Sequence, residues 1–197
     1  MKFLVIDSNS IIHRAFHALP PLTDKEGILV NAVYGFFSVL IRMERETSPD
    51  SVIATFDLPG PTFRHKKYEK YKETRPPTPS DLIGQFSIIK EGLIQLKIPI
   101  VEEEGFEADD LIGSVVNRVS SEGIGSSMIL TGDRDNLQLI DSKTEVILLK
   151  RGIKDLEIYS EEKFREEYQG LNPDQLIEIK ALQGDSSDNI PGVAGIG

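Results

Sequence analysis

The sequence of 197 residues contains no cysteine and no tryptophan, and only 7% of its residues are aromatic. The absence of cysteine excludes disulfides, thiolate metal ligands and a cysteine nucleophile, and it fits a reducing compartment. No apolar run reaches the roughly 18 residues of a membrane span, and the apolar stretch Phe3–Ile6 is too short for a signal peptide. We therefore expect a soluble protein of the cytoplasm without a membrane partner.

Several motifs that carry chemistry in other enzymes are also missing. The sequence has no P-loop, no GxGxxG fingerprint and no GxSxG nucleophile elbow. The three histidines, His13, His17 and His65, share no spacing typical of a metal site, although His13 and His17 lie four residues apart. We interpret the histidines as structural residues or incidental substrate contacts.

Short apolar runs alternate with segments of helical periodicity. The runs predict strands at residues 2–7, 51–57, 98–101, 127–131 and 145–149, with an edge strand at 156–159. The periodic segments predict helices at residues 8–19, 31–45, 80–97, 108–121, 160–168 and 173–182. This alternation predicts an α/β fold with a mostly parallel central sheet flanked by helices, whose functional crevice lies at the carboxyl ends of the strands.

The charge is distributed unevenly along the chain. The formal net charge of −10 by itself argues against a nucleic-acid partner. The segment Thr62–Arg75, which lies between two proline-rich stretches, is nevertheless basic and contains tyrosines. Its cations are Arg64, Lys66, Lys67, Lys70, Lys72 and Arg75, against the acids Glu69 and Glu73. The segment could be a solvated helix face with Glu–Lys pairs, or a basic arm attached to an acidic body.

Acidic residues follow three of the predicted strands. Asp7 ends the first strand, Asp57 ends the second, and Asp133 follows the strand that ends at Thr131. Because the carboxyl ends of parallel strands meet at one edge of a sheet, we expect these side chains to gather there. Further acids occur in the motifs EADD, DRD and DSSD. The full set is Asp7, Asp57, Glu107, Asp109, Asp110, Asp133, Asp135, Asp185 and Asp188.

Oxygen ligands without histidine or cysteine favour Mg²⁺ or Mn²⁺ over zinc. Two such ions roughly 4 Å apart can activate a water and stabilise the leaving oxygen of a phosphoryl displacement. Each acidic motif also has a structural explanation as a helix N-cap, a partner of a helix dipole or an Asx turn. Capping alone does not predict acids at three strand ends together with two more acidic loops and a basic arm.

Six stretches of the sequence resemble a known family. They are LVIDSNSIIHRAFHAL, NAVYGF, TFDLPGPTFRHKKYEKYKETRPPTP, EGFEADDLIGSV, LTGDRDNLQLI and ALQGDSSDNIPGVAGIG. The stretches run from residue 4 to the last residue and are specific as a set, although TGDRD or EADD alone would not be. On these residues the sequence resembles the N-terminal 5′-nuclease domain of bacterial DNA polymerase I, within the flap endonuclease superfamily and its PIN-like fold.

The resemblance implies that the nine acids bind two Mg²⁺ or Mn²⁺ ions. Those nearer one ion would be Asp7, Asp57, Glu107 and Asp109, and those nearer the other Asp110, Asp133, Asp135, Asp185 and Asp188. Among them we expect Asp57 and Asp133 to be indispensable for catalysis.

The resemblance also implies that the basic segment, at about residues 61–79, is the helical arch under or through which a 5′ single strand passes. Lys72 and Arg75 correspond to cations that steer the scissile phosphate and act in catalysis. Tyr71 aligns with an aromatic residue that stacks on a terminal base, and Arg64 is a further phosphate contact.

The sequence departs from the family at three places. Asp7-Ser8 stands where the family usually has Asp-Gly, which reduces backbone freedom, and Arg134 stands where lysine is commoner. In the family, GVAGIG begins a helix–three-turn–helix that grips duplex DNA through backbone amides and a monovalent cation. The sequence stops at Gly197 inside that motif. We therefore expect a fragment with a nuclease core at residues 1–184 and the start of a truncated motif at 185–197.

These features lead us to expect a divalent-metal-dependent 5′–3′ exonuclease or 5′-flap endonuclease that hydrolyses DNA. The expected partners are DNA with a 5′ end or 5′ flap and an RNA primer, with the protein a monomer that is fused to a polymerase domain in its natural form. A PIN-type ribonuclease is one alternative, against which the basic arch and the GDSSDN loop argue. A non-catalytic DNA-structure-binding fragment is the other, against which the presence of all nine acids argues.

Overall fold

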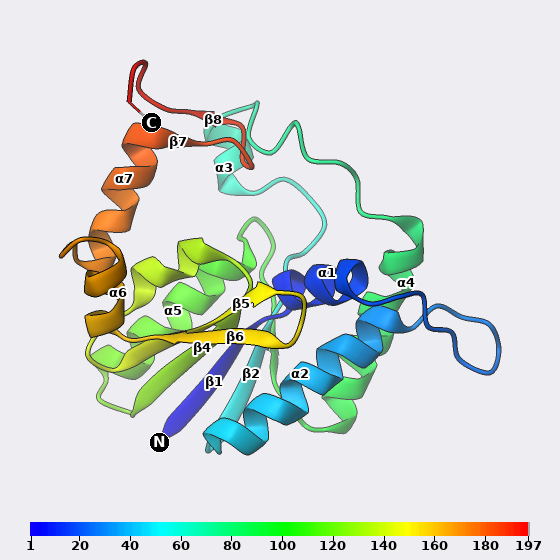
Figure 1. Ribbon diagram of the computed structural model, residues 1–197. Coiled ribbons are helices and arrows are strands. Elements are labelled where there is room, and N and C mark those ends of the chain that lie inside the picture. The colour runs from blue at the N-terminus through cyan, green and yellow to red at the C-terminus, as the bar shows by residue number, and fades with distance from the viewer. Residues whose placement is uncertain (197) are drawn as a thin grey trace.

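The computed structural model describes residues 1–196 and contains a central six-stranded sheet (Figure 1). The strands lie in the order β3-β2-β1-β4-β5-β6, and all neighbours are parallel except β5 and β6, which are antiparallel. Their bounds are Lys2–Asp7 (β1), Ser51–Thr55 (β2), Ile100–Val101 (β3), Ser126–Thr131 (β4), Thr144–Arg151 (β5) and Asp155–Tyr159 (β6). The predicted α/β fold with a mostly parallel sheet is confirmed.

Helices cover both faces of this sheet (Figure 1). One face carries α1 (Ser8–Ala18), α2 (Asn31–Thr47) and α4 (Ser80–Gln95). The other carries α5 (Ala108–Ser121), the 3₁₀ helices η1 (Arg134–Leu139) and η2 (Pro173–Gln175), α6 (Glu161–Glu167) and α7 (Leu176–Gln183). None of these helices, within residues 1–196, is both long and apolar enough to cross a membrane.

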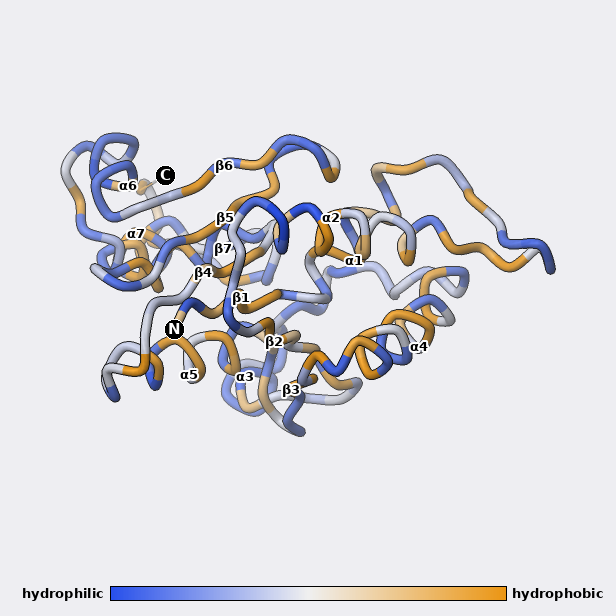
Figure 2. Tube along the Cα trace, turned by 90° about the horizontal axis from the view of Figure 1, so that it is seen from below, coloured by the Kyte–Doolittle hydropathy of each residue, from blue (hydrophilic) through white to orange (hydrophobic). Residues whose placement is uncertain are grey.

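The sheet is buried on both faces, which explains why its strands read as continuous apolar runs. Along β1, Leu4 and Ile6 pack in the core beneath α1, α2 and α4, whereas Val5 packs beneath α5. Figure 2 shows the apolar stretches of the central strands and of α4 between more hydrophilic connecting segments. The rigid sheet therefore fixes where each strand ends, and with it the position of the residues that follow.

The basic segment is only partly helical, which corrects the expectation of a helical arch over residues 61–79. A short helix, α3, covers Phe63–Lys67, and turns and extended chain follow as far as Pro79. Figure 1 shows this segment passing over the carboxyl ends of the strands between α3 and α4. Helix α3 ends because its C-cap, Tyr68, has an extended backbone. No helix resumes at Lys72, which has a positive φ of 57°, or at the prolines 76, 77 and 79, which supply no backbone N–H.

The last described residues form a small hairpin rather than a helix. Strands β7 (Gly184–Asp185) and β8 (Ile190–Pro191) pair antiparallel, and residues 192–196 contain no helix. Gly197, where the expected helix–three-turn–helix would continue, lies outside the described residues. That motif and the predicted division at residues 184 and 185 remain predictions.

Candidate metal centre

A cavity of about 490 Å³ lies at the carboxyl ends of the parallel strands. Eight of the nine predicted carboxylates line it, together with cations from the arch and from α7. The acids are Asp7, Asp57, Glu107, Asp109, Asp133, Asp135, Asp185 and Asp188, and the cations Lys72, Arg75 and Lys180. Segments that are up to 181 residues apart in the sequence thus meet in one place, as the alternation of strands and helices predicted.

Asp7 is the most deeply buried of these acids, with 4% of its surface exposed. It caps α1, because its Oδ1 accepts a hydrogen bond of 3.1 Å from the backbone N–H of Ser10. Its Oδ2 accepts a hydrogen bond of 2.7 Å from the hydroxyl of Thr131. Burial and, next, the negative charge of Asp109 raise the pKa of Asp7 above its ordinary range. A cation in the cavity would offset both the cost of burying the charged carboxylate and its repulsion by Asp109.

Asp57 and Glu107 connect the end of β2 to the start of α5. The Oδ1 atom of Asp57 accepts a 2.6 Å hydrogen bond from the backbone N–H of Ala108, in the first turn of α5. Glu107 is the N-cap of that helix, and its backbone N–H donates a 3.0 Å hydrogen bond to Oδ2 of Asp110. The capping explanation of the EADD motif is therefore correct for Asp110, while Glu107 both caps the helix and lines the cavity.

Asp109 and the acids of the TGDRD motif form the opposite wall. Asp109 accepts a 2.9 Å hydrogen bond from the side-chain amide of the buried Asn136, and burial is the main cause that raises the pKa of Asp109. Asp133 caps η1 by accepting from the backbone N–H of Asp135 at 2.9 Å. Each cap uses only one carboxylate oxygen, so capping leaves ligand oxygens available.

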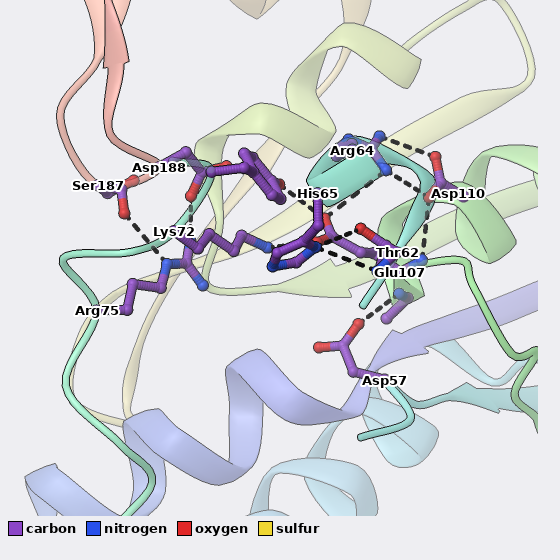
Figure 3. A network of polar contacts seen from close by, with 12 residues as sticks. Asp57, Thr62, Arg64, His65, Lys72, Arg75, Glu107, Asp110, Ser187 and Asp188 are labelled. Carbon is purple, nitrogen blue, oxygen red and sulfur yellow. Dashed lines mark hydrogen bonds and ion pairs between the residues drawn. The ribbon is translucent and has the colours of Figure 1, made fainter. Parts of the chain in front are cut away.

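Cations of the arch neutralise part of this acidic cavity (Figure 3). The ammonium of Lys72 lies 2.8 Å from Oε1 of Glu107, and the guanidinium of Arg75 lies 2.5 Å from Oδ1 of Asp188. Figure 3 shows both side chains reaching from the arch toward these carboxylates. The two residues predicted to contact a phosphate therefore lie beside the acids predicted to bind metal.

Arg64 and Asp110 lie slightly apart from the cavity. The guanidinium of Arg64 donates two hydrogen bonds to Asp110, at 2.6 and 2.9 Å (Figure 3). Asp110 lines a separate, neighbouring cavity, not the one that holds the other eight acids. In the described conformation Asp110 therefore does not lie with the other expected metal ligands, because a bidentate ion pair holds it to the arch.

Tyr71 is placed differently from a base-stacking residue. Only 5% of its surface is exposed, and its hydroxyl donates to Glu107 at 2.9 Å or to Asp188 at 3.0 Å. The edge of the ring also packs against His65, with the ring centroids 5.1 Å apart. A base could stack on this ring only after the arch has moved.

Lys180 is a site residue that the sequence analysis missed. Its ammonium lies 2.5 Å from Asp135 and 2.7 Å from Asp185 and bridges the two acidic loops. Although burial opposes the shift, hydrogen bonds from Lys180 and Ser187 lower the pKa of Asp185 to about 2. The only available signal was a lone cation five residues before Asp185, which nothing distinguishes from an ordinary surface lysine.

The donor set fits a hard divalent cation. The nine expected ligands offer only carboxylate oxygens, and burial is the main cause that raises the pKa values of the buried Asp7 and the half-buried Asp109, an effect that a divalent cation would offset. Within residues 1–196, however, no three acidic or histidine side chains are arranged closely enough to form a metal site as they stand. Lys72, Arg75 and Lys180 instead pair with these carboxylates, so metal binding requires side chains to rearrange.

The same fold occurs in solved nuclease structures. The bacteriophage T5 D15 protein, co-crystallised with metal ions, superimposes with a TM-score of 0.79 at 21% identity, over 100% of this chain and 72% of that chain. Human GEN1 in complex with Holliday junction DNA gives a TM-score of 0.57 at 17% identity, over 98% of this chain and 46% of that chain. At these identities the likeness shows a shared fold.

Sequence relatives are closer and cover the whole chain. DNA polymerase I of Bacillus caldotenax is 44% identical over 196 residues, which is 100% of this chain and 22% of that protein. DNA polymerase I of Bacillus subtilis is 42% identical over 100% of this chain and 22% of its own length. The chain thus spans less than a quarter of these relatives. Residues 2–169 match the 5′–3′ exonuclease, N-terminal resolvase-like domain family, and the chain belongs to that family.

Proposed function

We propose that this chain is a divalent-metal-dependent 5′ nuclease that hydrolyses phosphodiester bonds of DNA at a 5′ end or 5′ flap. The observation that carries the proposal is the single cavity into which β1, β2, β4 and the start of α5 deliver their carboxylates. Two Mg²⁺ or Mn²⁺ ions, when bound, would supply an activated water and neutralise the charge of the leaving oxygen. Asp7, Asp57, Glu107, Asp109, Asp133, Asp135, Asp185 and Asp188 would hold them, with Asp110 joining after release from Arg64.

The arch supplies the cations for the substrate. Lys72 and Arg75 contact Glu107 and Asp188, and these short ion pairs place both cations at the mouth of the acidic cavity. Once metal ions neutralise the carboxylates, the same two side chains are free to bind the scissile phosphate and to stabilise the charge that develops in the transition state. Arg64 is a further phosphate contact, and Tyr71 stacks on a terminal base once the arch has opened.

The cavity is suited to recognising the sugar-phosphate backbone and the shape of the DNA rather than its base sequence. Its lining is dominated by carboxylates and cations, with a few prolines, histidines and short side chains. Direct recognition of a base sequence normally requires side chains inserted in a groove of the duplex. The proposed partners are therefore DNA with a 5′ flap, nick or free end, and an RNA primer annealed to DNA. We further propose a monomeric nuclease core at residues 1–184, with the arch at about 61–79. It would be followed by a duplex-binding motif that starts at 185–197 and takes a monovalent cation, and by a polymerase domain.

The decisive experiment compares Asp57→Asn and Asp133→Asn with the unaltered chain on a 5′-labelled flap substrate. We expect the unaltered chain to release a short 5′ product with Mg²⁺ or Mn²⁺ and none with EDTA, and both variants to lose cleavage. Circular dichroism of each variant serves as the control for folding. Full cleavage by both variants would exclude the proposed carboxylate centre.

A matched RNA flap distinguishes the nuclease from a PIN-type ribonuclease. Both substrates carry the same sequence and the same label, so only the 2′-hydroxyls of the flap differ. We expect efficient cleavage of the DNA flap. Cleavage of the RNA flap alone would favour a ribonuclease, and binding of the DNA flap without turnover in Mn²⁺ would favour a non-catalytic binding module.

A further inference from the structure

Thr131, the last residue of β4, lies between two of the site acids. Its side chain is fully buried, with 0% of its surface exposed. The hydroxyl lies 2.7 Å from Oδ2 of Asp7 and accepts a 2.9 Å hydrogen bond from the backbone N–H of Asp133. One side-chain oxygen thus contacts the carboxylate of Asp7, at the end of β1, and the backbone N–H of Asp133, which follows β4.

The direction of these hydrogen bonds is fixed by chemistry. The backbone N–H of Asp133 can only donate, so the oxygen of Thr131 must accept from it. The single hydroxyl proton is then free to point at Asp7, which as a carboxylate can only accept. The hydrogen bonds therefore run from the N–H of Asp133 to the oxygen of Thr131 and from the hydroxyl of Thr131 to Asp7, so each donor meets an acceptor.

This chain holds Asp7 in one orientation. Its Oδ1 accepts from the N–H of Ser10 and its Oδ2 from Thr131, so both oxygens are fixed while each keeps a lone pair for a cation. The loop after Thr131 is tied to α1 as well, because the N–H of Gly132 donates to the hydroxyl of Ser10 at 2.9 Å. A Cβ at position 132 would lie 2.5 Å from Nε of Arg14 and 2.8 Å from that hydroxyl, so a larger residue there would have to displace these side chains.

We propose that Thr131 is a positioning residue that orients Asp7 and Asp133 together for metal binding. The inference rests on the proposed function, since it assumes that these two acids hold divalent ions. In metal sites generally, hydrogen-bonding partners of the ligands fix ligand geometry, and their removal lowers metal affinity. The hydroxyl of Thr131 would do so for two acids at once, and this couples β1 to β4 at the site.

Thr55 provides a matched control inside the same sheet. It is the last residue of β2, it is also 0% exposed, and its hydroxyl donates a 2.9 Å hydrogen bond. The acceptor is the backbone carbonyl of Ile6, however, and not a site acid. Replacing either threonine by valine removes a buried hydroxyl beside the end of β1, since Thr55 pairs with Asp7 in the sheet register. Only the change at 131 removes a hydrogen bond to the carboxylate of Asp7 and to the backbone N–H of Asp133.

The experiment measures Mn²⁺ binding by calorimetry, without DNA, for the unaltered chain and for Thr131→Val, Thr131→Ser and Thr55→Val. We expect Thr131→Val to bind Mn²⁺ about 10–100-fold more weakly, the loss typical of removing a partner of a metal ligand. Thr131→Ser keeps the hydroxyl and should restore binding. Thr55→Val should bind as the unaltered chain does, and thermal unfolding in EDTA should show that both valine variants are folded.

A Thr131→Val variant that binds Mn²⁺ as tightly as Thr55→Val would overturn the inference and leave Thr131 a merely structural residue. If Thr131→Val does not fold, the pair Thr131→Ser and Thr131→Ala isolates the hydroxyl in the same way, and equal affinities would again reject the proposal. Because binding is measured without substrate, a protein that binds Mn²⁺ yet cleaves no flap would refute the proposed function and still test Thr131.

Discussion

Individual site residues hold two roles at once. Asp7 and Asp133 cap helices through one oxygen and line the acidic cavity with the rest of the side chain. Glu107 stands at the N-cap of α5, and its two oxygens accept from Lys72 and Tyr71. Capping fixes a carboxylate without burying all of its lone pairs, so it prepares an acid for a metal ion. The capping and metal-binding explanations of the sequence motifs are therefore compatible at these positions.

Lys72 gives the most direct test at the scale of a single residue. Its ammonium pairs with Glu107. We expect the side chain to move from that carboxylate to the scissile phosphate when metal ions occupy the cavity. We expect Lys72→Ala to slow cleavage of a 5′ flap about 10²–10³-fold, as when one group that stabilises transition-state charge is removed. DNA affinity should fall much less. Single-turnover cleavage and fluorescence anisotropy measure the two effects, and an effect confined to affinity would contradict the phosphate-steering role.

Lys66 offers the matched control for that substitution. It belongs to α3 in the same basic segment, but it does not line the acidic cavity. A general loss of positive charge should weaken DNA binding equally for Lys66→Ala and Lys72→Ala. Only Lys72→Ala should lower the single-turnover rate at saturating DNA.

At the scale of the elements, the arch and the Asp185–Asn189 loop are fastened to each other. The backbone N–H of Lys72 donates to the carbonyl of Asp188 at 2.9 Å, and the side chain of Asn189 donates to the carbonyl of Lys70 at 2.8 Å. The ion pair between Arg75 and Asp188 adds to this contact. Because Asp188 is also a proposed metal ligand, metal binding and arch closure compete for the same carboxylate.

That competition predicts how the arch responds to metal. We expect trypsin to cleave the arch after Lys70 or Lys72 slowly in EDTA and faster with Mn²⁺, because the ions replace the cations that hold the arch down. Mass spectrometry of the early fragments measures this, with cleavage after Lys25 in the loop before α2 as the reference. Slower cleavage of the arch with Mn²⁺ would show that the ions close it.

At the scale of the whole molecule, the acidic cavity should reduce the stability of the metal-free protein. Burial raises the pKa of Asp7 and of Asp109 above the ordinary value of 3.8, so the native state holds these protons more tightly than the unfolded chain. The associated stability is fully present below the unfolded pKa and is lost as the pH rises through the folded pKa. The pKa rises to about 6 for Asp109 and to about 8 for Asp7, so the free energy of unfolding in EDTA should fall between about pH 4 and pH 8 from this cause.

Asp7→Asn isolates the effect. Asparagine keeps the size of the side chain and removes the buried charge, so we expect a higher melting temperature in EDTA at pH 7.5. The rise should be at least about 2–4 °C, the shift that 1 kcal/mol produces in a domain of this size. At pH 4.5 the gain should shrink, because the unfolded chain, with an ordinary aspartate pKa of 3.8, then also begins to bind the proton that native Asp7 holds. Calorimetric scans at the two pH values test this, and a gain that grows toward low pH would contradict the assignment.

The local pattern of the chain determined most of the fold. Apolar runs predicted the strands, because a parallel sheet is buried on both faces. Helical periodicity predicted the main helices, because each packs one apolar face against the sheet. The acids at the strand ends were predictable for a related reason, since parallel strands deliver their carboxyl ends to one edge. The family resemblance added the roles of the arch residues, which periodicity cannot reveal.

The tertiary structure alone decided how those residues pair. That Asp110 turns to Arg64, that Tyr71 is buried between Glu107 and Asp188, and that Lys180 bridges Asp135 and Asp185 all depend on contacts between distant segments. The arch is likewise held by contacts between distant segments, since the backbone N–H of Lys72 donates to the carbonyl of Asp188. Sequence patterns record which residues are buried along one element, whereas pairing across elements depends on distances that only the folded chain sets.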